Sequence, residues 1–350
     1  MLFLIICIVI ILLLFLLSFI FHYFLNDQER YNGALYQFYL DNFGRLPDNI
    51  IINYYNRLHN KIVENDLRIY LNQVKDGIAA MRDKRLVLAG LIRNSKNNIP
   101  FIKSFYDELR SYFRGSVFLI VENNSSDGTR SALFNWKMND PSIMILCDQD
   151  LVEDRRECVL GGFETFYVEK IPHSERIKKL SYLRNIYLKY AREKLGDHDY
   201  LAVMDLDLKG NFFMDGILQS FHYMARNPSI SAISCNGLIK DKKKYKYYDS
   251  FAYVELGGSI EWDTTFDKSS HDYDVLEYTT KKYMRDLKMD RVVSAFGGFC
   301  IYHLNKLIQS EATYSYSRDE KLSCEHSHLH RQLDDVFVNP RMMFFIDDKN

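Results

Sequence analysis

From Lys84 onward, short apolar runs alternate with stretches that carry a helical pattern, and few folds accommodate that alternation. Each apolar run is five to seven residues long, which is the length of a buried strand. The predicted strands are residues 86–92, 116–121, 143–147, 200–204 and 230–235, and the predicted helices are residues 99–113, a segment starting near Thr129, residues 177–195 and residues 215–226. This order predicts an α/β fold in which helices flank a mostly parallel sheet.

Polar residues follow three of the predicted strands at the point where each strand ends. Arg93 and Asn94 follow the first strand, residues 122–129 (ENNSSDGT) follow the second, and residues 205–207 (DLD) follow the fourth. In open α/β sheets the ligand binds in the crevice at the carboxyl ends of the strands. We therefore expect these three clusters to line one binding site.

Asp205 and Asp207 are the residues in these clusters with the clearest chemistry. Residues two apart in an extended chain point to the same side, so the two carboxylates would form a site of hard oxygen ligands. Such a site suits Mn²⁺ or Mg²⁺, which would neutralise a diphosphate leaving group. The alternative is a pair of solvated aspartates that end a strand. Their place after a buried strand favours the metal site.

Four segments in this order resemble glycosyltransferases of the GT-A fold: residues 91–94, 122–129, 183–185 and 204–207. Residues 85 to 345 as a whole resemble the capsule-associated α-1,3-mannosyltransferase family of fungi, which has related proteins in large DNA viruses. Residues 247–252, 295–299 and 324–326 strengthen this resemblance. It implies a GT-A (Rossmann-like) domain over residues 85–350 that transfers a hexose, with mannose favoured, from a nucleotide-diphosphate sugar to a glycan acceptor.

The same resemblance assigns roles to single residues. Glu122 and Asp127 would lie by the base and ribose of the nucleotide, and Arg184 would reach the donor phosphates or orient the two aspartates. The predicted donor-binding residues are Arg93, Asn94, Glu122, Asn123, Asp127, Arg184, Asp205, Gly297 and Gly298, the glycines lining the sugar or acceptor pocket. The expected cofactors are Mn²⁺ or Mg²⁺ and a nucleotide sugar, with GDP-mannose favoured over a UDP-hexose.

A late histidine cluster, residues 323–331 (SCEHSHLHR), offers further ligands. If this segment is extended, His326, His328 and His330 share one face and could bind zinc, although a polar strand surface has the same pattern. GT-A enzymes commonly complete the metal site with a late histidine, so His326 joins Asp205 and Asp207 as a predicted metal ligand. Glu325 could act as a general base or contact the acceptor. Asp207 and Glu325 are thus the predicted catalytic residues.

The N-terminal residues 2–21 form one apolar run without a charged residue. About 20 helical residues span the roughly 30 Å of a bilayer core, so this run predicts a transmembrane anchor within residues 1–25. Residues 26–84 have a polar helical pattern and predict a stem or cap. Held through residues 2–25, the chain would be a single-pass protein of a Golgi-like, ER-like or host membrane. The flanking charges do not orient it.

Charge and cysteine content exclude other classes. The net charge of −1 gives no basic face for nucleic acid, so the expected partners are a nucleotide sugar and a glycan, glycoprotein or glycolipid acceptor. Six scattered cysteines form neither a disulfide scaffold nor a zinc framework. Two alternative functions stay open: a sugar-phosphate nucleotidyltransferase, although the first strand lacks the Gly-rich loop, and a non-catalytic membrane-tethered glycan- or nucleotide-binding protein.

Overall fold

The computed structural model describes residues 35–43, 64–146, 173–241, 244–259, 288–317 and 323–347, together with the single positions 13, 45, 47, 51, 52 and 282. The chain divides into two compact units, residues 1–75 and 76–350. In the first unit residues 35–43 are helical, and the rings of Tyr39 and Phe43 pack 4.8 Å apart. The division falls inside helix α3 (Glu64–Met81), whereas the sequence pattern predicts a domain boundary at residue 85.

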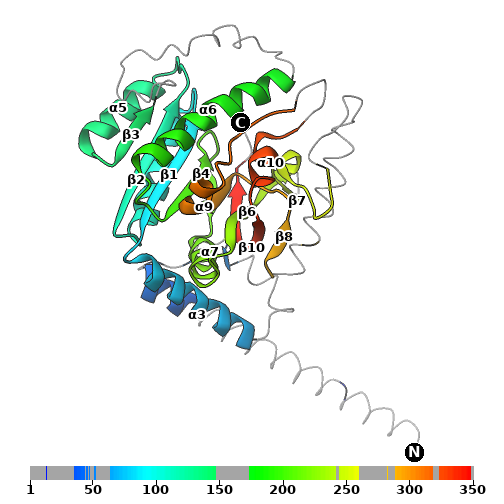
Figure 1. Ribbon diagram of the computed structural model, residues 1–350. Helices are drawn as coiled ribbons and strands as arrows, with labels where there is room; N and C mark the ends of the chain where they lie inside the picture. The colour runs from blue at the N-terminus through cyan, green and yellow to red at the C-terminus, as the bar shows by residue number, and fades with distance from the viewer. Residues whose placement is uncertain are drawn as a thin grey trace, which may run out of the picture. The chain divides into compact units, whose positions relative to one another are not determined.

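In the described residues of the second unit, ten strands form one sheet (Figure 1). The order is β3-β2-β1-β4-β9-β6-β10-β5, with β7 paired to β6 and β8 paired to β10. The strands are β1 (Arg85–Ile92), β2 (Gly115–Glu122), β3 (Ile143–Leu146), β4 (Tyr200–Asp205), β5 (Gly210–Phe212), β6 (Ile230–Asp241), β7 (Lys244–Tyr247), β8 (Asp290–Val292), β9 (Phe299–His303) and β10 (Asp335–Ile346).

The sheet is mixed, which corrects the prediction of a mostly parallel one. Strands β3, β2, β1 and β4 are parallel, as are β6 and β10. Strand β9, however, lies antiparallel between β4 and β6, and β5, β7 and β8 each pair antiparallel with a neighbour. Buried parallel and buried antiparallel strands both appear in the sequence as short apolar runs. The sequence pattern alone therefore does not show which strands run antiparallel to their neighbours.

Helices cover both faces of the sheet. On one face α6 (His173–Lys194) packs on β1 and β2 through Leu183, Tyr187 and neighbouring apolar residues. On the other face Tyr106 of α4 (Ile99–Arg110) packs on Phe118 of β2, with ring centroids 5.0 Å apart. The other described helices are η1 (Lys96–Asn98), α5 (Thr129–Asn139), α7 (Met214–Arg226), η3 (Ser250–Ala252), α9 (Leu304–Gln309) and α10 (Glu325–His330).

Each strand and helix predicted from residue 84 to residue 235 is present, with ends that differ by a few residues. The largest shift at the start of a helix is in α6, which begins at His173 instead of residue 177. Strand β6 continues to Asp241, six residues beyond its predicted end. Pro100 lies in the first turn of α4, where its missing N–H costs no helical hydrogen bond. Mixed α/β architecture with helices on both faces of a central sheet is therefore confirmed.

No helix in the described part of the chain is both long enough and apolar enough to cross a membrane. The longest described helices, α3 and α6, carry five and nine charged residues. This finding corrects the predicted single-pass membrane location. Residues 2–21, on which that prediction was based, lie outside the described residues apart from Leu13.

Gly297 and Gly298 hold the backbone in a conformation that side chains disfavour, with φ of 65° and 90°. A Cβ on Gly297 would collide with the carbonyl oxygen of Cys235 and lie 2.9 Å from the backbone nitrogen of Gly237. The carbonyl of Gly298 accepts a hydrogen bond from the backbone N–H of Asp205 at 3.1 Å. These glycines therefore let two backbone segments approach behind Asp205.

We predict that Gly297→Ala destabilises the protein by more than about 3 kcal/mol, because it adds a backbone clash to left-handed strain. Gly257→Ala is the matched control, since Gly257 has φ of 83° but a Cβ added there would meet no atom within 4 Å. Strain alone should cost the control about 1–2 kcal/mol. Urea unfolding of the two variants measures the difference, and equal losses would contradict the close approach.

Candidate active site

The sheet register brings the predicted strand-end clusters to one edge. Ile92 pairs with Glu122 between β1 and β2, and Leu91 pairs with Asp205 between β1 and β4. The ends of three parallel strands are therefore level, and the segments that follow them leave the sheet side by side. The polar clusters that follow these strands are therefore neighbours at one edge of the sheet.

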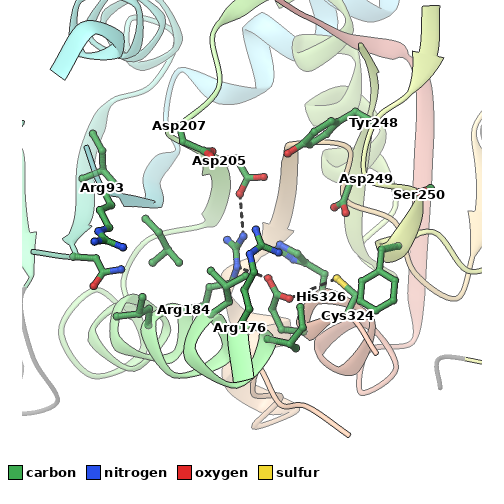
Figure 2. A pocket seen from close by; sticks show the side chains of 18 residues that line it. Arg93, Arg176, Arg184, Asp205, Asp207, Tyr248, Asp249, Ser250, Cys324 and His326 are labelled. Atoms are coloured by element: carbon green, nitrogen blue, oxygen red, sulfur yellow. Dashed lines mark hydrogen bonds and ion pairs between the residues drawn. The ribbon is translucent and has the colours of Figure 1, made fainter. Parts of the chain in front are cut away.

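A pocket of about 420 Å³ lies at this edge (Figure 2). Its walls come from the ends of β1, β2 and β4, from the first half of α6, from the segment after β7 and from the start of α10. Of the predicted site residues, those that line it are Arg93, Asn123, Arg184, Asp205, Asp207, Glu325 and His326. Elements far apart in sequence thus place basic, acidic and imidazole side chains around one space.

Arg184 joins three of these elements. Its Nε donates to Oε1 of Glu325 at 3.0 Å, and an NH2 group donates to Oδ1 of Asp205 at 2.9 Å. The residue is 4% exposed, and its guanidinium lies over the rings of Phe296 and Tyr314 at 5.4 and 5.9 Å. Burial acts to lower the pKa of Arg184, but Tyr187, Asp205, Glu325 and Tyr314 hold it well above its usual value, so the side chain stays cationic.

Asp205 lies in an acidic environment that this arginine only partly offsets. Burial raises the pKa of Asp205 to about 6, and the charges of Asp207 and Glu325 act in the same direction, while Arg184 opposes them. Arg184 occupies Oδ1 of Asp205, and Oδ2 has no hydrogen-bond partner among the described residues. The site therefore presents a carboxylate oxygen in surroundings that favour a cation.

Other predicted nucleotide-binding residues form hydrogen bonds within and between the loops that follow β1 and β2. Glu122 is fully buried, accepts the backbone N–H of Ser125 at 2.6 Å and pairs with Arg130 at 3.1 Å. Asp127 accepts the backbone N–H of Lys96 at 3.1 Å and that of Thr129 at 2.9 Å. Desolvation opposes the shift, but the Thr129 hydroxyl and these two backbone hydrogen bonds lower the pKa of Asp127.

Asn94 also connects these two loops. It has φ of 48°, and its Oδ1 accepts the backbone N–H of Ser126 at 2.8 Å. Together these contacts hold the segments after β1 and β2 against each other beside the pocket. Asn94, Glu122, Asp127, Gly297 and Gly298 are not among the residues that line it.

The histidine segment is helical, which corrects the extended conformation considered for it. In α10 the three imidazoles do not share a face: His328 Nε2 lies 2.7 Å from Ser323 Oγ, whereas His330 contacts Ser294 Oγ at 3.0 Å and the Tyr302 hydroxyl at 2.8 Å. Of the three, His326 is the one that lines the pocket. The zinc site of three histidines is therefore not formed.

His326 is a buried imidazole that borders the pocket. Its ring stacks on Phe296 with centroids 3.7 Å apart, and neither ring nitrogen has a hydrogen-bond partner among the described residues. Burial, reinforced by Arg184, holds its pKa well below the usual value, so the ring is neutral. In the described part of the chain, no three His, Cys, Asp or Glu side chains already converge as a metal site.

Sequence reasoning gave no role to several pocket residues, among them Arg176, Tyr248, Asp249 and Ser250. Arg176 is an exposed residue in the first turn of α6, and the other three follow β7. Residues 247–252 contribute to the family resemblance, but the sequence pattern assigns no role to any of them. Because this segment is distant in sequence from Asp205 and Asp207, the sequence alone does not show that it lies opposite them.

Comparison with known proteins gives weak likenesses. The sequence matches no protein-family model and no curated protein. Among solved structures, the mannosyltransferase PcManGT from Pyrobaculum calidifontis, in complex with GDP-Man and Mn²⁺, is 13% identical with a TM-score of 0.40, and the match covers 91% of this chain and 68% of that one. S. aureus TarS 1-349 in complex with UDP-GlcNAc is 12% identical with a TM-score of 0.41, covering 76% and 59%. At these values the matches transfer no ligand or residue role.

The buried Arg184–Glu325 pair predicts strong energetic coupling. Arg184→Met leaves the buried carboxylate of Glu325 and the partly buried one of Asp205 without their partner and should destabilise the protein by about 3–5 kcal/mol. Adding Glu325→Gln should restore part of that loss. Lys189→Met on the same helix, which removes an exposed pair with Glu193, should cost less than about 0.5 kcal/mol. Urea unfolding of the double-mutant cycle measures the coupling, and strictly additive losses would contradict it.

Proposed function

We propose that this chain is a glycosyltransferase that transfers a hexose from a nucleotide-diphosphate sugar, with a divalent cation held by Asp205 and Asp207. The observation that carries the proposal is the pocket itself. Two carboxylates at the end of β4 face a cavity whose other walls carry arginines, an amide and aromatic side chains. Its volume of about 420 Å³ is within the range of small-molecule sites.

The residues present fit a bound divalent cation. Asp205, Asp207, Asp249 and Glu325 bring four carboxyl groups to the pocket, and the buried cation among them, Arg184, is already engaged by two. Carboxylate oxygens are the ligands that Mn²⁺ and Mg²⁺ prefer. Asp205 and Asp207 would hold the cation, with His326 as a further candidate. When bound, it would supply positive charge to the diphosphate leaving group.

The remaining residues divide into donor-binding and positioning roles. Arg93 and Arg176 line the pocket and carry the charge that a diphosphate requires, and Asn123 offers an amide to the nucleotide. Arg184 keeps Asp205 in place through its hydrogen bond to Oδ1. Glu122, Asp127 and Asn94 support the walls of the site by fixing the two loops next to it.

The finer assignment rests on the resemblance to the fungal capsule-associated α-1,3-mannosyltransferases and their viral relatives. On that basis we propose GDP-mannose as the donor, with a UDP-hexose as the alternative, and a GT-A domain over residues 85–350. The acceptor would be a hydroxyl of a glycan, glycoprotein or glycolipid.

We predict that the full-length protein binds GDP or UDP in the presence of Mn²⁺ and that EDTA weakens this binding. Asp205→Asn and Asp207→Asn should each weaken Mn²⁺-dependent nucleotide affinity more than about tenfold, or about 1.4 kcal/mol, because each removes a charged oxygen ligand. Asn at 205 can still accept the hydrogen bond of Arg184, which protects the fold. Isothermal titration calorimetry measures both effects.

Asp197→Asn is the matched control, since Asp197 is an exposed carboxylate just before the other end of β4. It should leave nucleotide binding unchanged. Undiminished, EDTA-resistant binding by both aspartate variants would rule out the assigned metal site. Glycosyl transfer releases a nucleoside diphosphate from a nucleotide sugar. Release of pyrophosphate from a nucleoside triphosphate and a sugar phosphate would instead indicate nucleotidyl transfer.

A further inference from the structure

The segment after β7 forms the pocket wall that faces the two proposed metal-binding aspartates. Figure 2 shows Tyr248 and Asp249 on one side of the pocket and Asp205 and Asp207 on the other. The backbone of this wall is fixed, because the N–H of Tyr248 donates to the carbonyl of Gly237 at 2.8 Å, and the N–H of Ala252 donates to the carbonyl of Asp249 at 3.1 Å. The wall therefore presents its side chains from a rigid support.

Asp249 lines the pocket in a position from which its carboxyl group can contact a ligand. Its backbone lies in the left-handed region with φ of 63° and ψ of 47°, a conformation that Asp and Asn tolerate better than most residues. The side chain is half-buried, and its carboxyl oxygens have no hydrogen-bond partner among the described residues. Burial, reinforced by the charges of Asp205 and Glu325, raises the pKa of Asp249 to about 7.

Glu325, the residue first considered as a general base, is engaged elsewhere. Its Oε1 accepts from Arg184 at 3.0 Å, its Oε2 accepts from the Cys324 thiol at 3.7 Å, and the residue is 3% exposed. A carboxylate with both oxygens occupied is a poor proton acceptor for an incoming hydroxyl. Through Arg184 it can instead fix the position of Asp205.

We infer that Asp249 is the catalytic residue that contacts the acceptor and removes the proton from its attacking hydroxyl, and that Glu325 is a positioning residue. This inference rests on the proposed glycosyl transfer. The acceptor oxygen forms a bond to the anomeric carbon of the donor sugar, and the bond from that carbon to the diphosphate breaks. The nucleoside diphosphate leaves with the electron pair, and the acceptor proton passes to Asp249 and then to solvent.

The same wall points to a neutral sugar as the acceptor. Tyr248 is half-buried beside Asp249 and offers an aromatic ring, a surface on which sugar rings pack. Burial raises the pKa of Tyr248, so its hydroxyl stays protonated and can donate a hydrogen bond. Asp249 already adds a carboxyl group to an acidic pocket, which disfavours an anionic acceptor such as a uronic acid.

The test compares wild-type protein with Asp249→Asn, which keeps the left-handed backbone, and with Glu255→Gln, an exposed control that lies just beyond the 3-10 turn η3. Nucleoside diphosphate release is measured from GDP-mannose and from UDP-glucose, with methyl α-mannoside, methyl α-glucoside or glucuronic acid as acceptor probes. Binding of GDP and UDP with Mn²⁺ is measured on the same samples by calorimetry.

We expect Asp249→Asn to bind nucleotide like wild type while its kcat for transfer to a methyl hexoside falls by about 100-fold or more, as for loss of a general base. Glu255→Gln should keep both properties, and glucuronic acid should be a poor acceptor. Full transfer by Asp249→Asn, or a wild type that binds nucleotide but uses neither methyl hexoside, would overturn the inference alone. A wild type that binds neither nucleotide would overturn the proposed function itself.

Discussion

One buried guanidinium, that of Arg184, connects the elements on which the candidate site is built. It extends from α6 and donates to Asp205 at the end of β4 and to Glu325 at the start of α10. These partners lie 21 and 141 residues away in sequence. A buried charge is tolerated only when it is paired, so the positions of both carboxylates depend on this arginine. The three elements that meet at this side chain also line the pocket.

The electrostatic consequence is an acidic pocket that is incompletely neutralised. Arg184 is engaged by two carboxylates, while Asp207 and Asp249 add two more carboxyl groups to the lining. Burial raises the pKa of Asp205 to about 6 and that of Asp249 to about 7, and the neighbouring carboxylates add to both shifts. A cation near Asp205 and Asp207 would offset this negative charge, and Arg93 and Arg176 on the pocket lining would then serve an anionic ligand. Charge distribution thus links the packing of the site to its proposed chemistry.

Features determined locally could be predicted from the sequence. The apolar runs that form β1, β2 and β4 can be recognised in the sequence, and Asp205 directly follows the apolar run of β4. Features determined by distant contacts could not. The antiparallel direction of β9 depends on its neighbours β4 and β6, and the helical state of His326–His330 depends on packing against Ser294 and Tyr302. Asp249 was missed for the same reason, since only the fold brings it opposite Asp205.

The most direct test of this account is anomalous diffraction from crystals of the full-length protein grown with Mn²⁺ and GDP, or with Mn²⁺ and UDP. The account predicts one manganese peak bonded to the carboxylates of Asp205 and Asp207 and to the diphosphate, with the Arg184–Asp205 hydrogen bond retained. A nucleotide bound in another part of the molecule, or manganese bound away from both aspartates, would contradict it.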